Sequence, residues 1–221
     1  GDKVYACGRN FSAYEGSETL LEAKQKLQLV EVSFDLMDSQ SILATLKDIE
    51  SLDIAILNAG TCEYIDDAEH FDAALFERVI QTNVISIGYC LQALIPKMKR
   101  GAHLALMGSS ASYAPFQRAE AYGASKAAIH YLAKSLQLDI PAERLSISVI
   151  APGFVKTPLT NKNDFPMPML IEVNQAASHI INGIAKNKKH IHFPFPFTSF
   201  LIVMGSFPDR IWQWVALRMK R

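Results

Sequence analysis

Several features that define whole classes of protein are absent from this sequence. Lysine plus arginine and aspartate plus glutamate both number 22 among 221 residues, so the chain has no net charge. That balance argues against a nucleic-acid-binding surface as the main function. No apolar run reaches the ~18 residues of a membrane-spanning helix, and no signal peptide opens the chain. We therefore expect a cytoplasmic protein without a nucleic-acid partner, and a membrane partner is disfavoured.

Cysteine is also scarce. The chain has Cys7, Cys62 and Cys90, an odd number without the spacing of metal ligands. These thiols are expected to be small, buried or half-buried side chains in a reducing compartment. His190 and His192 fall on one face of an expected strand. A metal would need further ligands, so no metal site is predicted.

Internal repeats and low-complexity linkers are missing too, and hydrophobic residues make up an ordinary 49% of the chain. The length suffices for one well-buried domain, so we predict a single domain over residues 1–221. Largely apolar runs predict strands at residues 4–7, 29–34, 52–57 and 104–107. Residues 145–150, which alternate serine with apolar residues, and residues 188–193, centred on His190-Ile191-His192, are expected to form the last two strands. Periodic patterns predict helices at residues 17–28, 40–50, 72–98, 120–138, 171–185 and 208–221.

The feature that is present, and around which the rest is arranged, is the segment from Tyr122 to Lys126. A phenol and an ammonium four residues apart lie on one face of a helix. A free tyrosine has a pKa near ~10, and a nearby cation favours the phenolate, so Lys126 is expected to lower that pKa. A serine in the upstream Gly108-Ser109-Ser110 could then hold a substrate oxygen. The same helical pattern alone also describes an ordinary exposed helix.

Five motifs occur in a recognisable order: Asn58-Ala59-Gly60 after a strand, Asn83 in the next helix, Ser109, Tyr122-x-x-x-Lys126, and Pro152-Gly153 after a further strand. Together they resemble the short-chain dehydrogenases/reductases, over about the whole chain. The resemblance implies an α/β fold with a Rossmann-like, doubly wound parallel sheet. It also implies hydride exchange between NAD(P) and a carbonyl or secondary alcohol.

The resemblance assigns roles to four catalytic residues. Tyr122 would be the acid/base, Lys126 would lower its pKa and hold the ribose hydroxyls, Ser109 would orient the substrate oxygen, and Asn83 would place a relay water. Ser110 is the alternative catalytic serine, although Ser109 matches the family's usual register.

Cofactor choice is read from the end of the first predicted strand, where Arg9 stands and no acidic residue is present between Val4 and Asn10. An arginine there accepts a 2′-phosphate, so NADP(H) is expected rather than NAD(H). The alternative is a solvated loop arginine. By resemblance Asp35 accepts from the adenine amino group and Leu36 flanks the ring, while Asp38 or Ser39 could cap the next helix. The other cofactor-binding residues that the resemblance implies are Asn58, Ala59, Gly60, Tyr122, Lys126, Pro152, Gly153, Val155 and Thr157.

The start of the sequence departs from the family pattern, because the family's first strand, its glycine-rich phosphate loop and its first helix do not precede the strand at residues 4–7. Two explanations compete. Either the given sequence omits its start, or the protein lacks the loop. The first is favoured because the remaining motifs are intact.

Two segments flank the expected site. Residues 158–170 are expected to form a substrate lid, and the side chains of Phe165, Met167 and Met169 suggest an apolar substrate. Residues 194–221 form a C-terminal extension that ends in a basic amphipathic helix. This helix is expected to pack on a neighbouring subunit or over the cleft, with an interfacial membrane helix as the alternative.

The sequence therefore predicts an NADP(H)-dependent oxidoreductase acting on a small carbonyl or alcohol substrate, as a homodimer or homotetramer. A non-catalytic NADP-binding or scaffold protein of the same fold is the first rival, supported by the absent glycine loop. A membrane-associated lipid or sterol reductase is the second, supported by the aromatic C-terminal segment.

Overall fold

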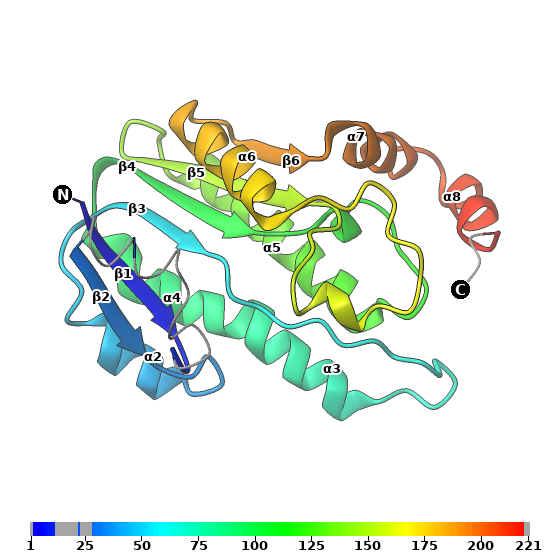
Figure 1. Cartoon of the computed structure of the whole chain (residues 1–221), viewed down its shortest axis with the longest axis horizontal. Helices are drawn as coiled ribbons and strands as arrows, with labels where there is room; N and C mark the ends of the chain where they lie inside the picture. The colour runs from blue at the N-terminus through cyan, green and yellow to red at the C-terminus, as the bar shows by residue number, and fades with distance from the viewer. Residues whose placement is uncertain (1, 12–21, 23–27, 219–221) are drawn as a thin grey trace.

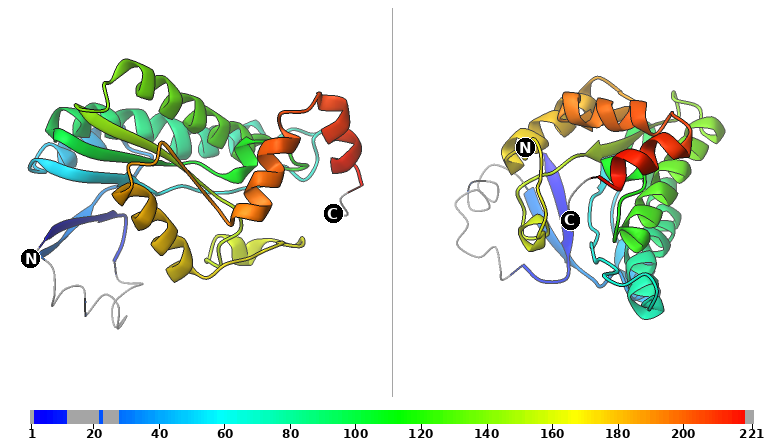
Figure 2. Two further views of the ribbon diagram at one scale, coloured as in Figure 1. Left: turned by 90° about the horizontal axis from the view of Figure 1, so that it is seen from above. Right: turned by 90° about the vertical axis from the view of Figure 1, so that its right-hand side faces the viewer.

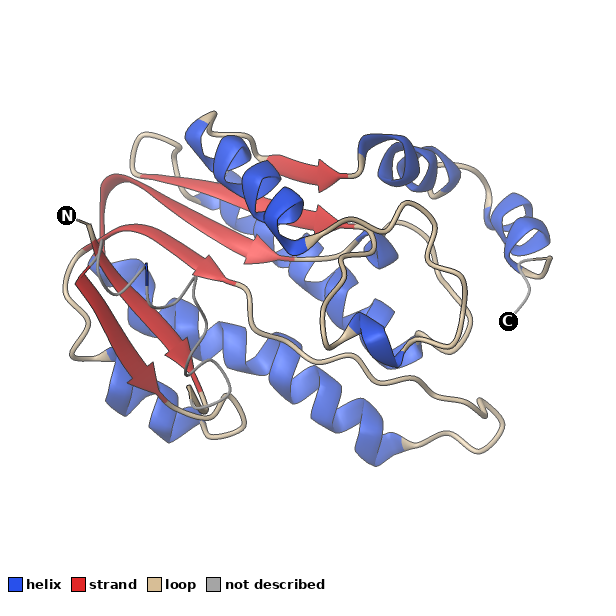
Figure 3. Ribbon diagram, viewed as in Figure 1, coloured by secondary structure: helices blue, strands red, loops and turns tan. Residues whose placement is uncertain are grey.

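A computed structural model describes residues 2–11, 22 and 28–218 of the chain (Figure 1). Within these residues the strands form two parallel sheets, one in the order β1-β2 and the other in the order β3-β4-β5-β6. The strands are β1 (Lys3–Gly8), β2 (Gln28–Ser33), β3 (Leu52–Leu57), β4 (Met98–Met107), β5 (Leu145–Pro152) and β6 (His190–Phe193). Parallel strands require crossover connections, and helices supply most of them here (Figure 3).

The helices cover both faces of the larger sheet (Figure 2), as a doubly wound fold requires. They are α2 (Ser39–Leu46), α3 (Ala73–Ile80), α4 (Ser86–Leu94), α5 (Glu120–Asp139), α6 (Val173–Ala185), α7 (Phe195–Met204) and α8 (Asp209–Ala216). Helices α4 and α5 pack on one face and α6 on the other. The predicted fold class is confirmed.

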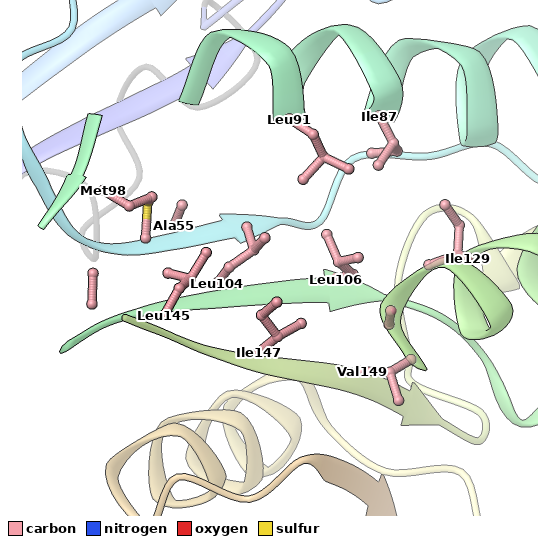
Figure 4. Close-up of a cluster of buried hydrophobic side chains, with 12 residues drawn as sticks. Ala55, Ile87, Leu91, Met98, Leu104, Leu106, Ile129, Leu145, Ile147 and Val149 are labelled. Carbon is pink, nitrogen blue, oxygen red and sulfur yellow. The ribbon is translucent and has the colours of Figure 1, made fainter. Parts of the chain in front are cut away.

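Alternation along the central strands divides the core between the two faces. Leu104 and Leu106 of β4 point toward α4 and α5, whereas Ala105 between them points toward α6. The larger cluster, drawn in Figure 4, combines these leucines with Ile87 and Leu91 of α4 and Ile129 of α5. The apolar run over residues 104–107 marked the buried end of β4, whose first half is more polar, whereas β5 alternates serine with apolar residues.

The two-stranded sheet is tied to the rest through side chains. In the described residues no ladder of hydrogen bonds joins β1 or β2 to β3. Instead, Ile42 and Leu46 of α2 pack with Leu94 of α4 in a cluster that Tyr5 of β1 and Leu57 of β3 also contact. The helices therefore hold the smaller sheet beside the β3 end of the larger one (Figure 1).

The predicted single helix over residues 72–98 corresponds to a helical stretch over Ala73–Lys97, with two local departures. Asp72 caps it, with a carboxylate that accepts from the Leu75 amide, and a π-helical turn, Gln81–Ile85, interrupts its α-helical pattern. It then ends in a 3₁₀ turn before Met98, which already belongs to β4. This helical stretch has the length and hydropathy of a membrane span. Its buried side chains nevertheless pack on the sheet, which is typical of a core helix.

The other boundaries differ by smaller amounts. Helix α2 ends at Leu46 rather than residue 50, and Asp38 is its N-cap, accepting from two backbone amides. Helix α6 begins at Val173, because Ile171 pairs with Val155 in an isolated bridge. The predicted helix over residues 17–28 lies outside the described residues except at Glu22 and Gln28, and Gln28 begins β2.

Candidate active site

The carboxyl ends of β3 and β4 bring the predicted catalytic residues to one edge of the sheet. Gly60 follows β3, and Ser109 follows β4 and caps a 3₁₀ turn that begins at Ser110. Helix α5 passes behind this edge and carries Tyr122 and Lys126 in its first two turns. The strand order β3-β4 makes these segments neighbours, although they are far apart in the sequence.

Asn83 lies in the π-helical turn and is almost fully buried, with 1% of its surface exposed. Its Nδ2 donates to the Thr61 carbonyl and to Ser125 Oγ, both at 2.9 Å, and its Oδ1 accepts from the Thr61 amide at 2.8 Å. The side chain thus braces the segment after β3 against α5. A π turn is a common local device at functional sites, because the extra residue re-aims a side chain.

Lys126 is buried beneath the same segment, with 5% of its surface exposed. Its Nζ donates to the Met107 carbonyl at the end of β4, at 2.9 Å. Burial lowers the pKa of this ammonium to about 8. A Cβ placed on Gly60 would come within 3.0 Å of Asn83 Oδ1 and 3.4 Å of Lys126 Nζ. Glycine at this position therefore keeps the backbone close to the lysine.

Tyr122 is half-buried beside these groups, and the Lys126 Nζ lies 5.8 Å from the centre of its ring. Burial raises the pKa of Tyr122 to about 12, and a hydrogen bond from Ser109 partly offsets this by lowering the pKa. The expectation that Lys126 lowers this pKa is not met in the structure, because desolvation of the phenolate dominates. Of the two serines weighed from the sequence, Ser109 contacts Tyr122 while the buried Ser110 begins the following turn.

Sequence reasoning missed two residues that border Tyr122. Cys62 lies close enough to influence the pKa of both Tyr122 and Lys126, and burial raises the pKa of its own thiol. Tyr64 contacts Cys62, and burial raises the pKa of its phenol as well. Both belong to an irregular segment, where no periodic pattern marks a side chain that faces a site. Their only signal was position, a few residues after Asn58-Ala59-Gly60.

Aromatic side chains form a wall next to these residues. The Tyr64 ring meets Phe165 edge-on with 5.7 Å between ring centres, and Phe154 lies 6.1 Å from Phe165 and 5.6 Å from Phe197. The Tyr64 hydroxyl also donates to Asn163 Oδ1 at 2.9 Å. Residues from the predicted lid therefore contact the segment that borders Tyr122, and the wall they form is apolar.

Arg118 forms ion pairs with both the segment after β3 and the predicted lid. Arg118 pairs with Asp66 at 2.6 Å and with Asp164 at 2.8 Å, and its guanidinium lies 5.3 Å from the centre of the Tyr64 ring. Asp66 belongs to the irregular segment after β3 and Asp164 belongs to the predicted lid, so Arg118 connects these two segments. This pair of contacts could not be read from the sequence, because the three residues lie far apart in it.

The residues predicted to select the cofactor lie at the ends of the smaller sheet. Arg9 follows β1 and is exposed, and its carbonyl accepts from Ser33 Oγ at 3.0 Å. Asp35 and Leu36 follow β2 and are half-buried. The Asp35 carboxylate already accepts from the Met37 amide at 2.9 Å, which uses part of its capacity in a local turn.

The remaining predicted cofactor residues lie at the carboxyl ends of β3 and β5. Asn58, Ala59 and Gly60 are all exposed. Gly153 follows β5, and a Cβ there would come within 2.9 Å of the Phe197 ring, so this glycine allows α7 to approach. The last members, Pro152, Val155 and Thr157, are half-buried at that edge, and the Val155 carbonyl accepts from Thr160 Oγ1 at 2.6 Å.

Tyr113 and the C-terminal histidines lie in a separate cluster. The Tyr113 hydroxyl pairs with His190 Nε2, and His130 Nδ1 shares a 2.9 Å hydrogen bond with Ser112 Oγ. Burial lowers the pKa values of His130 and His190 to about 4, so both rings are neutral at neutral pH. In the described part of the chain no group of three or more His, Cys, Asp or Glu residues could hold a metal ion.

The family assignment follows from comparison with known proteins. The model of the short chain dehydrogenase family matches residues 1–166 of this chain. A rhamnolipids biosynthesis 3-oxoacyl-[acyl-carrier-protein] reductase of Pseudomonas aeruginosa is 31% identical over 80% of this chain and 72% of its own length. The chain belongs to the short-chain dehydrogenase family, and it is an oxidoreductase acting on CH–OH or C=O groups with NAD(P).

Solved structures share the fold at low sequence identity. A short-chain dehydrogenase from Sphingobium yanoikuyae, in complex with NADPH, covers 100% of this chain and 87% of its own, with a TM-score of 0.77 and 17% identity. One from Burkholderia phymatum, in complex with NAD, covers 90% of this chain and 82% of its own, with the same TM-score and identity. Neighbours of this fold thus bind either dinucleotide, and the likeness does not choose between them.

Proposed function

We propose that this protein reduces the carbonyl group of an apolar substrate with NADPH, and that Tyr122 donates the proton. The observation that carries the proposal is the assembly of Tyr122, Ser109 and Lys126 at one edge of the sheet, beside an apolar wall. A phenol with a pKa of about 12 is protonated at neutral pH, as a general acid must be. These roles remain proposals, and the geometry supports them.

Each residue has a distinct part in the reduction. Ser109 contacts Tyr122 in the unliganded site, and with substrate bound its single O–H would turn to the carbonyl oxygen and hold that oxygen next to the phenol. Tyr122 then passes its proton to that oxygen. The ammonium of Lys126, still largely protonated at pH 7 with a pKa of about 8, stabilises the phenolate that remains. Asn83 positions the segment after β3, and the second lone pair of its Oδ1 could hold a relay water.

The residues present fit a nicotinamide dinucleotide. When bound, NADPH supplies the hydride that reduces the carbonyl carbon. The segment Asn58-Ala59-Gly60 is exposed, and Gly60 next to Lys126 has no side chain. A flat ligand can therefore approach the backbone there closely. Arg9 follows β1 and is exposed, and an arginine at this point would meet a 2′-phosphate, which supports the proposal of NADP(H) over NAD(H).

An absorbance assay tests the proposal directly. The protein is mixed with NADPH and a panel of ketones, aldehydes, quinones and 3-oxoacyl thioesters, the last because of the Pseudomonas aeruginosa relative's name. We expect NADPH oxidation, faster with apolar carbonyl substrates than with polar ones of similar size. Binding of NADPH without turnover of any substrate would instead favour a non-catalytic NADP-binding protein.

A further inference from the structure

The last two helices expose an unusual concentration of large apolar side chains. Between α7 and the end of the described chain, each of seven such residues is at least 43% exposed. They are Phe195, Phe200, Val203, Phe207, Ile211, Trp214 and Leu217. Patches of this kind on a soluble protein mark contact with a partner or a membrane. We call residues 195–218 the C-terminal arm.

Helix α7 is apolar on its exposed side. The exposed positions Phe195, Pro196, Phe200 and Val203 fall on one face, together with the half-buried Ser199. The opposite face buries Thr198 and Leu201 against the body of the protein. Its ten residues rise only about 15 Å, too little to cross the ~30 Å hydrocarbon core of a bilayer. A membrane role for α7 is therefore interfacial.

Helix α8 is anchored on one side and amphipathic on the other. Trp212 is buried, and its Nε1 donates to the Pro115 carbonyl at 2.6 Å. The outward face carries Ile211, Trp214 and Leu217, flanked by Arg210 and Arg218. The sequence alone favoured packing on a subunit or over the cleft. In the structure Trp212 packs against the body of the protein, and the apolar side chains on the outward face of α8 are exposed.

The mixture of arginine and aromatic residues on this face suits a lipid headgroup region. The Arg218 guanidinium lies 3.9 Å from the centre of the Trp214 ring, so cation and aromatic surface are presented together. The arm contains a single acidic residue, Asp209. Basic amphipathic helices with tryptophan bind anionic bilayers through apolar burial and attraction to phosphate. A two-fold contact with a second copy would instead bring these arginines toward one another.

The arm also lies where a membrane-derived substrate would arrive. Figures 1 and 2 show α7 and α8 at one end of the molecule, beyond the carboxyl ends of β5 and β6. Phe197 of α7 contacts Phe154, which belongs to the apolar wall beside Tyr122. The same helix therefore joins the uncovered surface to the site.

We propose that the C-terminal arm docks this enzyme on an anionic phospholipid bilayer, with its apolar side chains in the headgroup region and its arginines at the phosphates. Docking of this kind is independent of the reaction proposed above. It depends on the outward faces of α7 and α8 alone.

Vesicle flotation tests the proposal with the whole protein. We expect it to float with phosphatidylcholine vesicles that contain phosphatidylglycerol, and about tenfold less with phosphatidylcholine alone. The double variant Phe200→Ser with Leu217→Ser should lose most of this binding. The matched control is Phe71→Ser with Ile181→Ser, which removes side chains of similar exposure from a loop and from α6. That control should float like the wild type.

A second variant guards against a folding defect. Arg210→Glu with Arg218→Glu keeps the apolar residues, and it should abolish the preference for anionic vesicles while leaving the melting temperature unchanged. Circular dichroism and activity on a water-soluble substrate verify the fold of each variant. Absence of flotation, or equal flotation of wild type and the Phe200→Ser, Leu217→Ser variant, would overturn the proposal. So would an arm variant that changes only the oligomeric state in sedimentation, because the occupant would then be a second copy.

Discussion

The residues at the Tyr122 end of the proposed site are held by more hydrogen bonds of buried side chains than the residues at the Arg9 end. At the Tyr122 end, the buried Asn83 side chain makes three hydrogen bonds and Lys126 is held by the Met107 carbonyl. At the other end, Arg9 is exposed, and the Asp35 carboxylate accepts from the Met37 amide in a local turn. The comparison suggests that proton-transfer groups are built into the core, while cofactor choice depends on side chains at its margin. The predictions below test this difference, from the largest effect to the smallest.

The largest effect is expected from removing the hydroxyl of Tyr122. Tyr122→Phe should lower kcat by about 10²- to 10⁴-fold, the usual contribution of general acid–base catalysis. NADPH affinity, measured by fluorescence titration, should stay within about twofold because the ring remains. The matched control is Tyr113→Phe, which removes a half-buried phenol paired with His190 instead. Equal losses in both variants would contradict the assignment of Tyr122.

Asn83→Ala should cost stability as well as activity. Loss of three hydrogen bonds made by this buried side chain is expected to lower the free energy of unfolding by about 2–4 kcal/mol. Asp35→Ala removes one partly exposed contact and should cost less than about 1 kcal/mol. Urea denaturation followed by circular dichroism measures both. Similar losses of unfolding free energy in Asn83→Ala and Asp35→Ala would show that the Tyr122 end is held no more firmly than the Arg9 end.

The buried lysine predicts how stability depends on pH. Its pKa is depressed from 10.5 to about 8, so between these values the unfolded chain binds more protons than the folded one. The free energy of unfolding should therefore rise as pH increases from about 8 to 10, by about 2 kcal/mol. Above pH 10 the raised pKa of Tyr122 acts in the opposite direction. Denaturation of Lys126→Met across this range should show a flatter profile, and an unchanged slope would contradict a buried, charged lysine.

The smallest effect is expected at the exposed end. Arg9→Asp should lower the ratio of kcat/KM with NADPH to kcat/KM with NADH by about tenfold, because an attraction to the 2′-phosphate becomes a repulsion. The free energy of unfolding should change by less than about 0.5 kcal/mol, since the side chain is exposed. An unchanged cofactor preference would make Arg9 an ordinary loop residue.

The buried strands and most helix positions could be predicted because burial on both faces leaves a plain mark in the sequence. The apolar run from Leu104 to Met107 is one example, and it lies within β4. The π turn around Asn83 could not be predicted, because it depends on partners distant in sequence, Thr61 and Ser125. Helix α7 was missed because its prolines and its apolar residues on all sides give no helical period.

The site was predictable only as far as its motifs reached. Tyr122, Lys126 and Ser109 stand in a recognisable order, and the structure brings them together. Cys62 and Tyr64 lie in an irregular segment whose residues follow no periodic pattern, so the sequence did not single out these two side chains, which the structure places beside Tyr122. The raised pKa of Tyr122 could not be predicted from the sequence, because it results from burial of the phenol, which the sequence does not show, whereas the neighbouring lysine suggested a lowered pKa.

Transfer of an isotope label tests the central claim most directly. The protein is incubated with a carbonyl substrate and NADPH deuterated at the hydride position, and the product is analysed by mass spectrometry. We predict one deuterium on the carbinol carbon of the product with wild type, and at least about a hundredfold less labelled product in the same time with Tyr122→Phe. Bound NADPH with no labelled product from wild type, or equal labelling by both proteins, would contradict the account.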